Sequence, residues 1–172
     1  MTYQRIILIG YRATGKTSTA TALAEALEWR WFDSDIELAK EDGRDIATIF
    51  KEDGEPEFRR REAQILRRLV QESGAVIATG GGAILSEANR KLLKEAGPVF
   101  WLVASADVIR QRLTADEETT RNRPALSNTD VISEVEDVLA ERTRLYKACA
   151  DYEVATDGLT STDVAKKILS RL

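Results

Sequence analysis

The chain has 172 residues, of which 43% are hydrophobic and 31% are charged, and its formal net charge is -4. This length supports one domain with a substantial core and is too short for two ordinary domains. No excess of basic residues indicates a nucleic-acid surface, and no window approaches the roughly 18 consecutive apolar residues of a membrane span. We therefore expect a single domain, residues 1–172, with neither nucleic acid nor membrane as a partner.

Histidine is absent, and cysteine occurs once, at Cys149. The absence of histidine excludes the usual general base, histidine-containing triads and histidine-ligated metal sites. A single cysteine excludes an internal disulfide and suits a reducing cytosol. The chain enters a strand-like segment within a few residues and has no charged-then-apolar leader, so we expect a cytoplasmic protein whose acid–base chemistry depends on carboxylates.

Five short apolar segments predict strands, and most intervals between them carry helical patterns. The predicted strands are Arg5–Ile9, Arg30–Phe32, Ala75–Thr79, Val99–Val103 and Tyr152–Ala155, and the predicted helices are Lys16–Leu27, Pro56–Gln71, Glu87–Glu95, Ala106–Leu113, Asp130–Ala148 and Thr162–Leu172. The first and fourth strands are apolar at nearly every position, as central strands buried on both faces are. The alternation predicts an α/β fold with a parallel sheet covered by helices.

The segment between the first strand and the first helix reads Gly-Tyr-Arg-Ala-Thr-Gly-Lys-Thr, residues 10–17. This is a P-loop in its required setting, because a strand precedes it and a helix follows it. Its backbone N–H groups would face phosphate oxygens, Lys16 would reach the outer phosphates and the Thr17 hydroxyl would ligate Mg²⁺. The alternative is a glycine-containing turn that binds nothing. The candidate nucleotide ligands are Ala13, Thr14, Gly15, Lys16, Thr17 and Ser18.

Two carboxylates follow the second strand, in Asp33-Ser34-Asp35. Residues two apart in an extended segment point the same way, so both carboxylates can face one site. Asp33 would then assist Mg²⁺, and Asp35 would accept or orient a substrate hydroxyl. The alternative is a helix N-cap, which accounts for one of the two carboxylates.

The third strand runs into Gly80, Gly81 and Gly82, at the edge of the sheet where α/β proteins bind ligands. Three glycines leave a flat backbone floor on which a small ring can pack, whereas the alternative, a flexible turn, needs only one glycine. The later strands do not end in Asp, as in ATPase motors, and the chain lacks an Asn-Lys-x-Asp guanine motif. These absences favour a kinase.

Arginines on two predicted helices are candidate ligands for an anion. In Arg59-Arg60-Arg61 the three side chains cannot share a helix face, because successive residues are about 100° apart. Arg59 can pair with Glu62 three residues later. Arg142 occupies an apolar position of its helix and must either reach water or meet an anion. With Arg59 it would form a carboxylate clamp, and a solvated charged face is the alternative for the cluster.

Residues 115–128 are polar, weakly periodic and interrupted by a proline, which favours a mobile loop. Arg121 and Arg123 lie on this segment. A lid that brings an arginine to the transferring phosphates would neutralise developing charge and exclude water. Solubility is the alternative role for one of the two arginines.

Taken in chain order, the motifs resemble those of the shikimate kinases. They are the octet 10–17, Asp33-x-Asp35, Phe58-Arg59-x-x-Glu62, Gly80-Gly81-Gly82, Arg123-Pro124-x-Leu126 and Glu141-Arg142-x-x-Leu145-Tyr146. The resemblance spans the chain. It implies a P-loop NTPase three-layer sandwich with five parallel strands, a helical substrate-binding region at about 34–62 and a mobile lid at about 115–128.

The resemblance also implies ATP- and Mg²⁺-dependent phosphorylation of the 3-hydroxyl of shikimate, on the route to chorismate and the aromatic amino acids. Asp35 would contact the shikimate hydroxyls as a base or orienting group, Arg59 and Arg142 would bind the carboxylate, and the glycine floor, residues 80–82, would receive the ring. We expect shikimate as the small-molecule partner of a monomer.

On the nucleotide side, the resemblance assigns the phosphates to Lys16 and the metal to Thr17 and Asp33. Arg123 would be the lid arginine. Asp116 falls roughly where some members of the family place an arginine against adenine. Two other functions are open at this point: a kinase of another small hydroxylated carboxylate, such as a sugar acid, and a non-catalytic nucleotide-dependent binding module.

Overall fold

A computed structural model describes residues 3–115 and 134–172. Its centre is a five-stranded sheet in the order β2-β3-β1-β4-β5, and every neighbouring pair is parallel. The strands are β1 (Arg5–Ile9), β2 (Arg30–Asp33), β3 (Ala75–Ala78), β4 (Val99–Val103) and β5 (Tyr152–Ala155). The predicted parallel α/β fold is confirmed, with the apolar strands β1 and β4 inside the sheet.

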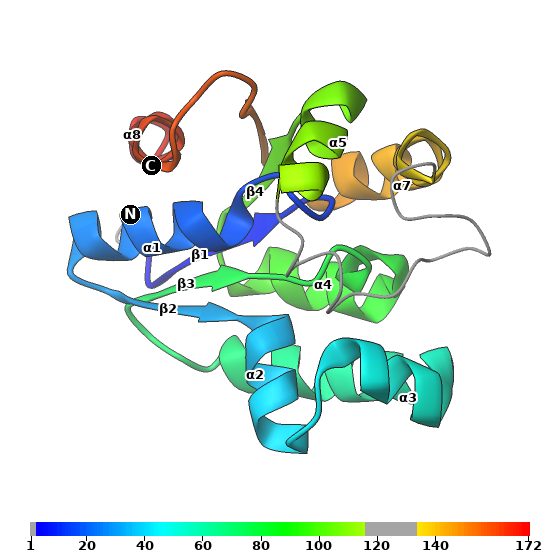
Figure 1. The fold of residues 1–172 in the computed structure, drawn as a ribbon. Helices are drawn as coiled ribbons and strands as arrows, with labels where there is room; N and C mark the ends of the chain where they lie inside the picture. Colours follow the sequence, from blue (N-terminus) through cyan, green and yellow to red (C-terminus); the bar gives the residue numbers. More distant parts are fainter. Residues whose placement is uncertain (1–2, 116–133) are drawn as a thin grey trace.

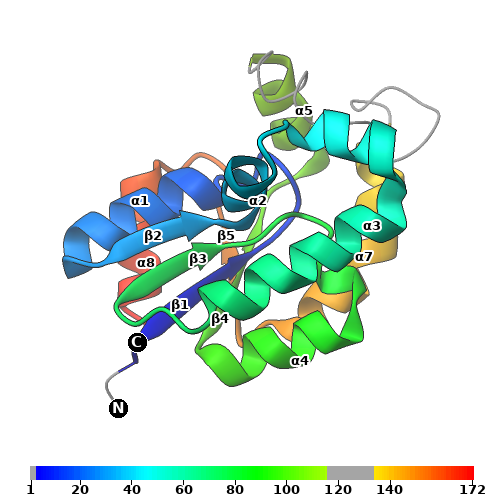
Figure 2. The same ribbon diagram turned by 90° about the horizontal axis from the view of Figure 1, so that it is seen from below.

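Helices cover both faces of the sheet and give three layers (Figure 1). On one face lie α1 (Lys16–Leu27) and α8 (Ser161–Leu169), and on the other lie α3 (Ile46–Leu69), α4 (Glu87–Ala96) and α7 (Val135–Cys149) (Figure 2). Alternate residues of a strand point to opposite faces, so Ile6 and Leu8 pack under α1 while Ile7 and Ile9 join the opposite core. The helices α2 (Ser34–Asp42) and α5 (Ala106–Ala115) and the short 3₁₀ turn η1 (Ala83–Leu85) complete the described elements.

Helix α3 is longer than the helix that periodicity predicted. We predicted a helix from Pro56, whereas α3 begins at Ile46 and is interrupted at Gly54, whose φ of 80° and ψ of 166° are not helical. The interruption divides the hydrophobic pattern, which hides the first part of the helix in a periodicity analysis. Asp45 caps this first part by accepting a hydrogen bond from the Thr48 N–H.

Helix α7 also overlaps its prediction only in part, because residues 130–133 lie outside the described residues.

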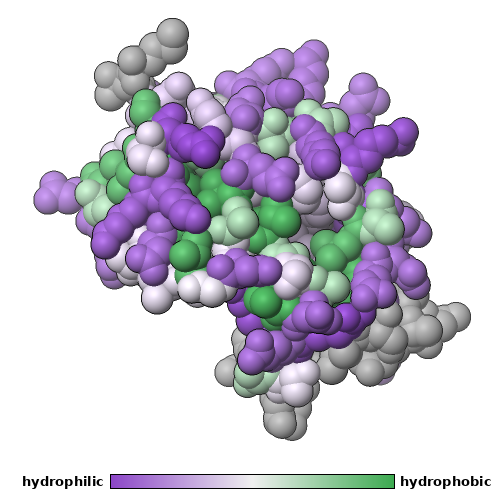
Figure 3. Space-filling view, turned by 90° about the horizontal axis from the view of Figure 1, so that it is seen from above, coloured by the Kyte–Doolittle hydropathy of each residue, from purple (hydrophilic) through white to green (hydrophobic). Residues whose placement is uncertain are grey.

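On the face shown in Figure 3, hydrophobic side chains lie in small groups between hydrophilic ones. Among the helices in residues 3–115 and 134–172, none combines the length and apolarity that crossing a bilayer requires.

Candidate active site

The P-loop connects β1 to α1 at the carboxyl edge of the sheet, and its shape depends on its backbone. Gly10 has φ 146°, and a β-carbon there would lie 2.5 Å from the carbonyl oxygen of Leu102. Gly15 has φ 91°, in the left-handed region that favours glycine. Ala13 adopts φ 59° although it has a side chain, a conformation that costs about 1–2 kcal/mol. The chain therefore accepts strain to keep this loop shape.

Lys16 lies inside the loop. Its ammonium group donates hydrogen bonds to the carbonyl oxygens of Gly10, at 2.8 Å, and Tyr11, at 2.7 Å. The Thr14 hydroxyl donates to the same Tyr11 carbonyl at 2.8 Å. These bonds place a positive charge at the mouth of the loop, at the start of α1.

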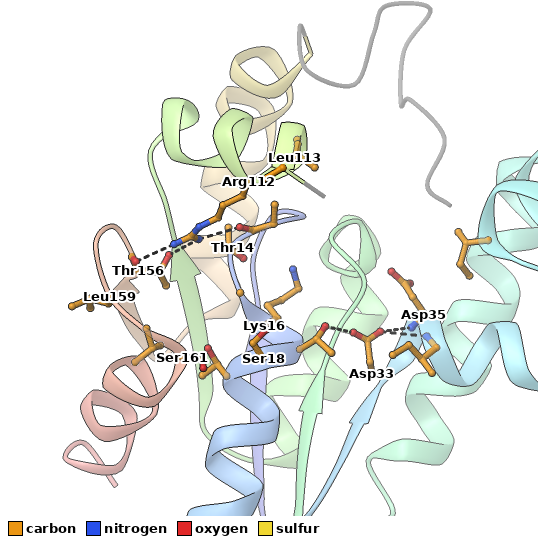
Figure 4. Close-up of a pocket in the computed structure, with 18 of the residues that line it drawn as sticks. Thr14, Lys16, Ser18, Asp33, Asp35, Arg112, Leu113, Thr156, Leu159 and Ser161 are labelled. Carbon is orange, nitrogen blue, oxygen red and sulfur yellow. Dashed lines mark hydrogen bonds between the residues drawn. The ribbon is translucent and has the colours of Figure 1, made fainter. Parts of the chain in front are cut away.

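A cavity of about 870 Å³ opens beside the loop (Figure 4). Its walls come from the P-loop, the start of α2, the end of α5 and the segment after β5. The candidate ligands Ala13, Thr14, Gly15, Lys16, Thr17 and Ser18 all line it, together with Asp33 and Asp35. The sequence-predicted nucleotide and metal ligands among the described residues therefore share one cavity.

Both carboxylate oxygens of Asp33 accept hydrogen bonds. Its Oδ1 accepts hydrogen bonds from the N–H groups of Asp35 and Ile36, so Asp33 is the N-cap of α2. Its Oδ2 accepts a 2.6 Å hydrogen bond from the Thr17 hydroxyl. The helix-cap alternative thus holds for Asp33, and the same carboxylate is placed against Thr17. Mg²⁺ takes oxygen ligands, usually a few from protein with the rest from water and phosphate, so this hydroxyl and carboxylate fit it.

Asp35 lies where two cavities meet. It lines the large cavity and also a second one of about 50 Å³. The second cavity is bounded by the P-loop, both parts of α3, the glycine floor and α7. Its lining residues are Tyr11, Arg12, Asp35, Ile46, Phe50, Phe58, Arg59, Glu62, Gly80, Gly81, Gly82 and Arg142. All the predicted acceptor-side ligands therefore converge beside the large cavity.

The glycine floor is held by side chains and covered by others. A β-carbon on Gly80 would lie 2.6 Å from Asp35 Oδ1 and 2.8 Å from Glu62 Oε1, and one on Gly82 would overlap the Arg59 guanidinium. These close approaches require glycine, which the flexible-turn alternative does not explain.

Hydrogen bonds fix the backbone of the floor. The Gly80 N–H donates to Ser34 Oγ at 2.8 Å, and the Tyr146 hydroxyl donates to the Gly81 carbonyl oxygen at 2.6 Å. The carbonyl oxygens of Gly80 and Gly82 accept from the N–H groups of Ala83 and Leu85. Side chains of α2 and α7 therefore hold the backbone of the floor in place.

Arg59 and Glu62 form the pair predicted from their spacing. Arg59 donates to Glu62 Oε2 at 2.8 Å, and the Glu62 side chain is only 2% exposed. The other oxygen, Oε1, is buried and has no hydrogen-bond partner among the residues that the structure describes. Burial raises the pKa of Glu62 to about 7, with Arg59 opposing the shift and Asp35 adding to it. The cavity thus holds a carboxyl group that titrates near neutral pH.

Arg142 is only 7% exposed, so most of its side chain lies away from water, which disfavours the snorkelling alternative. It lines the second cavity together with Arg59. Arg12, which the sequence analysis did not select, lines the same cavity from the P-loop, is equally buried and lies 3.9 Å from Glu134. Three guanidinium groups therefore border the space above the floor.

Arg112 on α5 is a second residue that the sequence analysis missed. It donates to the carbonyl oxygens of Ala13, at 3.0 Å, and Thr156, at 3.2 Å, and lies at the end of the large cavity away from Asp35 (Figure 4). Nothing in the helical pattern marks Arg112 as a site residue, because the sequence does not show that α5 packs beside the P-loop. Arg121, Arg123 and Asp116 lie outside the described residues.

Comparison with known proteins bears on this arrangement. A sequence model of the family described as shikimate kinase matches residues 12–172. The chain belongs to the shikimate kinase family. A shikimate kinase from Bordetella avium is 40% identical over 97% of this chain and 78% of its own length. One from Caldicellulosiruptor bescii is 39% identical over 97% of this chain and 94% of its own length.

A solved structure of a shikimate kinase has the same fold as this chain. It is the shikimate kinase from Acinetobacter baumannii in complex with shikimate, which is 36% identical, with a TM-score of 0.92 over 99% of this chain and 93% of that one. The predicted family and fold are therefore confirmed.

Proposed function

We propose that this protein transfers the γ-phosphoryl group of ATP to the 3-hydroxyl of shikimate. The observation that carries the proposal is the position of Asp35, which lines both the P-loop cavity and the cavity with the arginines. A donor in the first cavity and an acceptor in the second would meet at this carboxylate. Membership of the shikimate kinase family and similarity to a shikimate kinase in complex with shikimate support the choice of acceptor.

On the donor side, the loop amides and Lys16 would hold the phosphates of ATP, with Ala13, Thr14, Gly15, Thr17 and Ser18 around them. The fit of Thr17 and Asp33 to Mg²⁺ supports a metal ion between these residues and the phosphates, where it would neutralise charge on the transferring group. Arg112, at the far end of the cavity, would face the base of the nucleotide.

On the acceptor side, Arg59 and Arg142 would bind the carboxylate of shikimate, and Arg12 would add a third positive charge. Guanidinium groups bind carboxylates with two parallel hydrogen bonds. A cavity of about 50 Å³ holds no more than about two water molecules, so we expect the acid to displace a lining side chain, and Arg59, which lies over Gly82, is the one we propose. The ring would then rest on the floor at residues 80–82.

Asp35 would orient the 3-hydroxyl for in-line attack on the γ-phosphorus and receive its proton as the bond to the β–γ bridging oxygen breaks. Phosphoryl transfer through a loose transition state needs little assistance from a base, so orientation is the larger part of this role. Lys16 would stay with the phosphates during transfer.

The remaining expectations belong to the same proposal. Residues 34–62 would form the substrate-binding region and residues 115–128 the lid, with Arg123 as its catalytic arginine. We expect a single-domain, cytoplasmic monomer. The charge of -4 supports the absence of a nucleic-acid partner.

A coupled assay of ADP release tests this function. We expect turnover with shikimate and ATP, at most slow turnover with hydroxylated sugar acids, and a kcat that falls by about 10²-fold in Asp35→Asn, because the variant orients the hydroxyl less well. Calorimetry should show that the variant still binds both ligands. Faster turnover of a sugar acid would select the alternative kinase. If the wild type binds both ligands but shows no turnover, and Asp35→Asn behaves in the same way, the protein would be a non-catalytic binding module.

A further inference from the structure

The two parts of α3 meet at Gly54, and each contributes to the acceptor cavity. The first part supplies Ile46 and Phe50, and the second supplies Phe58, Arg59 and Glu62. The rings of Phe50 and Phe58 pack across the break, with centroids 4.8 Å apart and an interplanar angle of 44°. The shape of this cavity therefore depends on the angle between the two parts.

The Arg59 guanidinium also depends on that angle. Its central carbon lies 5.1 Å from the centroid of the Phe58 ring and 6.0 Å from that of Phe50, so it contacts residues from both parts. A change of bend at Gly54 would move one aromatic wall relative to the guanidinium. A small displacement of a positioning residue is enough to change substrate binding markedly.

Four side chains form a closed ring of charges around the break. Arg44 contacts Asp42 through Nε at 2.6 Å and Asp53 at 2.6 Å. Arg61 contacts the same two carboxylates, Asp42 and, at 3.0 Å, Asp53. Each arginine therefore binds both aspartates, and each aspartate binds both arginines.

The four residues of the ring lie on segments before and after the break at Gly54, so the ring links these segments. Asp42 ends α2, Arg44 lies in the connection to α3, Asp53 precedes Gly54 and Arg61 lies on the second part of α3. Their side chains are between 11% and 30% exposed, so water weakens the pairs less than it weakens fully exposed ones. Glu52 and Glu57 add one outer contact each, to Arg44 and Arg61.

We propose that the ring of Asp42, Arg44, Asp53 and Arg61 is a positioning device that sets the bend of α3 and thereby the affinity of the acceptor cavity for its acid substrate. None of the four residues lines that cavity among the described residues, so the ring acts through Phe50, Phe58 and Arg59. The substrate named here, shikimate, rests on the proposed function.

Arg61→Met and its neighbour Arg60→Met make a matched pair for the test. Arg60 is 56% exposed and pairs only with Glu57 in the described residues, so its loss leaves the ring intact. We expect Arg61→Met to raise the KM for shikimate by about tenfold, with kcat and the KM for ATP within about twofold of wild type. Arg60→Met should match the wild type in all three constants.

Two further variants separate positioning from general stability. Arg61→Lys keeps the charge without the planar fork that spans two carboxylates, so its KM should lie between those of wild type and Arg61→Met. The double variant Arg44→Met with Arg61→Met should raise KM by less than the product of the single effects, because both arginines serve the same carboxylates. A kcat that falls with KM unchanged, or multiplicative effects, would overturn the proposal.

Hydrogen exchange on the full chain tests the ring without any substrate. Exchange of the amides at 46–53 should be at least several-fold faster in Arg61→Met than in Arg60→Met, while the sheet is unchanged. Equal exchange in the two variants would overturn the ring whatever the substrate is. Failure of the wild type to phosphorylate shikimate would overturn the proposed function instead.

Discussion

The two cavities that meet at Asp35 are built in different ways. The nucleotide side is centred on one continuous segment, the P-loop and the start of α1, of which residues 13–19 line the cavity and whose backbone conformation shapes that part of the site. The acceptor side is made of side chains from four separate segments, the P-loop, α2 with α3, the glycine floor and α7. Substitutions on the nucleotide side should therefore act by distorting the backbone, and substitutions on the acceptor side by changing charge and side-chain packing.

Gly10→Ala should have the largest effect on stability and nucleotide affinity, because it distorts the backbone of the P-loop. The new β-carbon would meet the Leu102 carbonyl oxygen at 2.5 Å and the Thr14 hydroxyl at 2.9 Å. The Leu102 carbonyl belongs to the backbone of β4 and cannot yield without moving that strand, so we expect a loss of more than about 3 kcal/mol of stability and at least 100-fold in ADP affinity. Urea unfolding and calorimetry measure both. Gly43→Ala is the control for positive φ alone, since a β-carbon there meets nothing within 4 Å.

Arg142→Met should affect one side only. It removes a buried guanidinium from the acceptor cavity and keeps most of the apolar volume of the side chain. Loss of a charged hydrogen-bonding partner costs about 3 kcal/mol, so the affinity for shikimate should fall by roughly 100-fold. The affinity for ADP should stay within about twofold. Equal loss of both ligands would mean that the two sides are not independent.

Glu62→Gln tests the electrostatics of the acceptor side through pH. Burial raises the pKa of Glu62 from 4.5 to about 7. Between pH 4.5 and pH 7, the folded chain therefore keeps a proton on Glu62 that the unfolded chain has lost. Wild-type stability from this group is present below pH 4.5 and is lost as the pH rises towards 7. Glutamine cannot ionise, and the variant should gain about 2 kcal/mol relative to wild type between pH 5 and pH 7. Parallel stability curves in urea unfolding at several pH values would contradict this assignment.

Ala13→Gly should have the smallest effect. Glycine relieves the left-handed strain at φ 59° and also increases the freedom of the unfolded chain, so the two effects partly cancel. We expect stability to change by less than about 1 kcal/mol and ADP affinity by less than threefold. A tenfold loss of affinity would show that the Ala13 side chain itself contributes to the loop.

The difference between the two sides also explains what the sequence could predict. The P-loop is contiguous, so its residues and its flanking elements were found from spacing alone. The pairing of Arg59 with Glu62 followed from helical spacing, and the confirmed parallel sheet followed from the alternation of strands and helices.

Contacts between distant segments could not be predicted in the same way. Arg12 and Arg112 were missed because their partners, Glu134 and Thr156, are far along the chain. The first part of α3 was missed because Gly54 divides its pattern. The burial of Arg142 also depends on how α7 packs, so the sequence left its two alternatives open.

The hydrogen bonds that hold the glycine floor have a chemical consequence for what can rest on it. The carbonyl oxygens of Gly80, Gly81 and Gly82 all accept hydrogen bonds within the protein, the middle one from Tyr146. A molecule lying on the floor therefore meets carbonyl groups that each already accept one hydrogen bond, beside the guanidinium groups of Arg12, Arg59 and Arg142. A guanidinium group has donors and no acceptor, so an inhibitor in which an amide or amine replaces the acid would set donors against the donors of these arginines, whereas tetrazole or phosphonate groups would keep the required polarity.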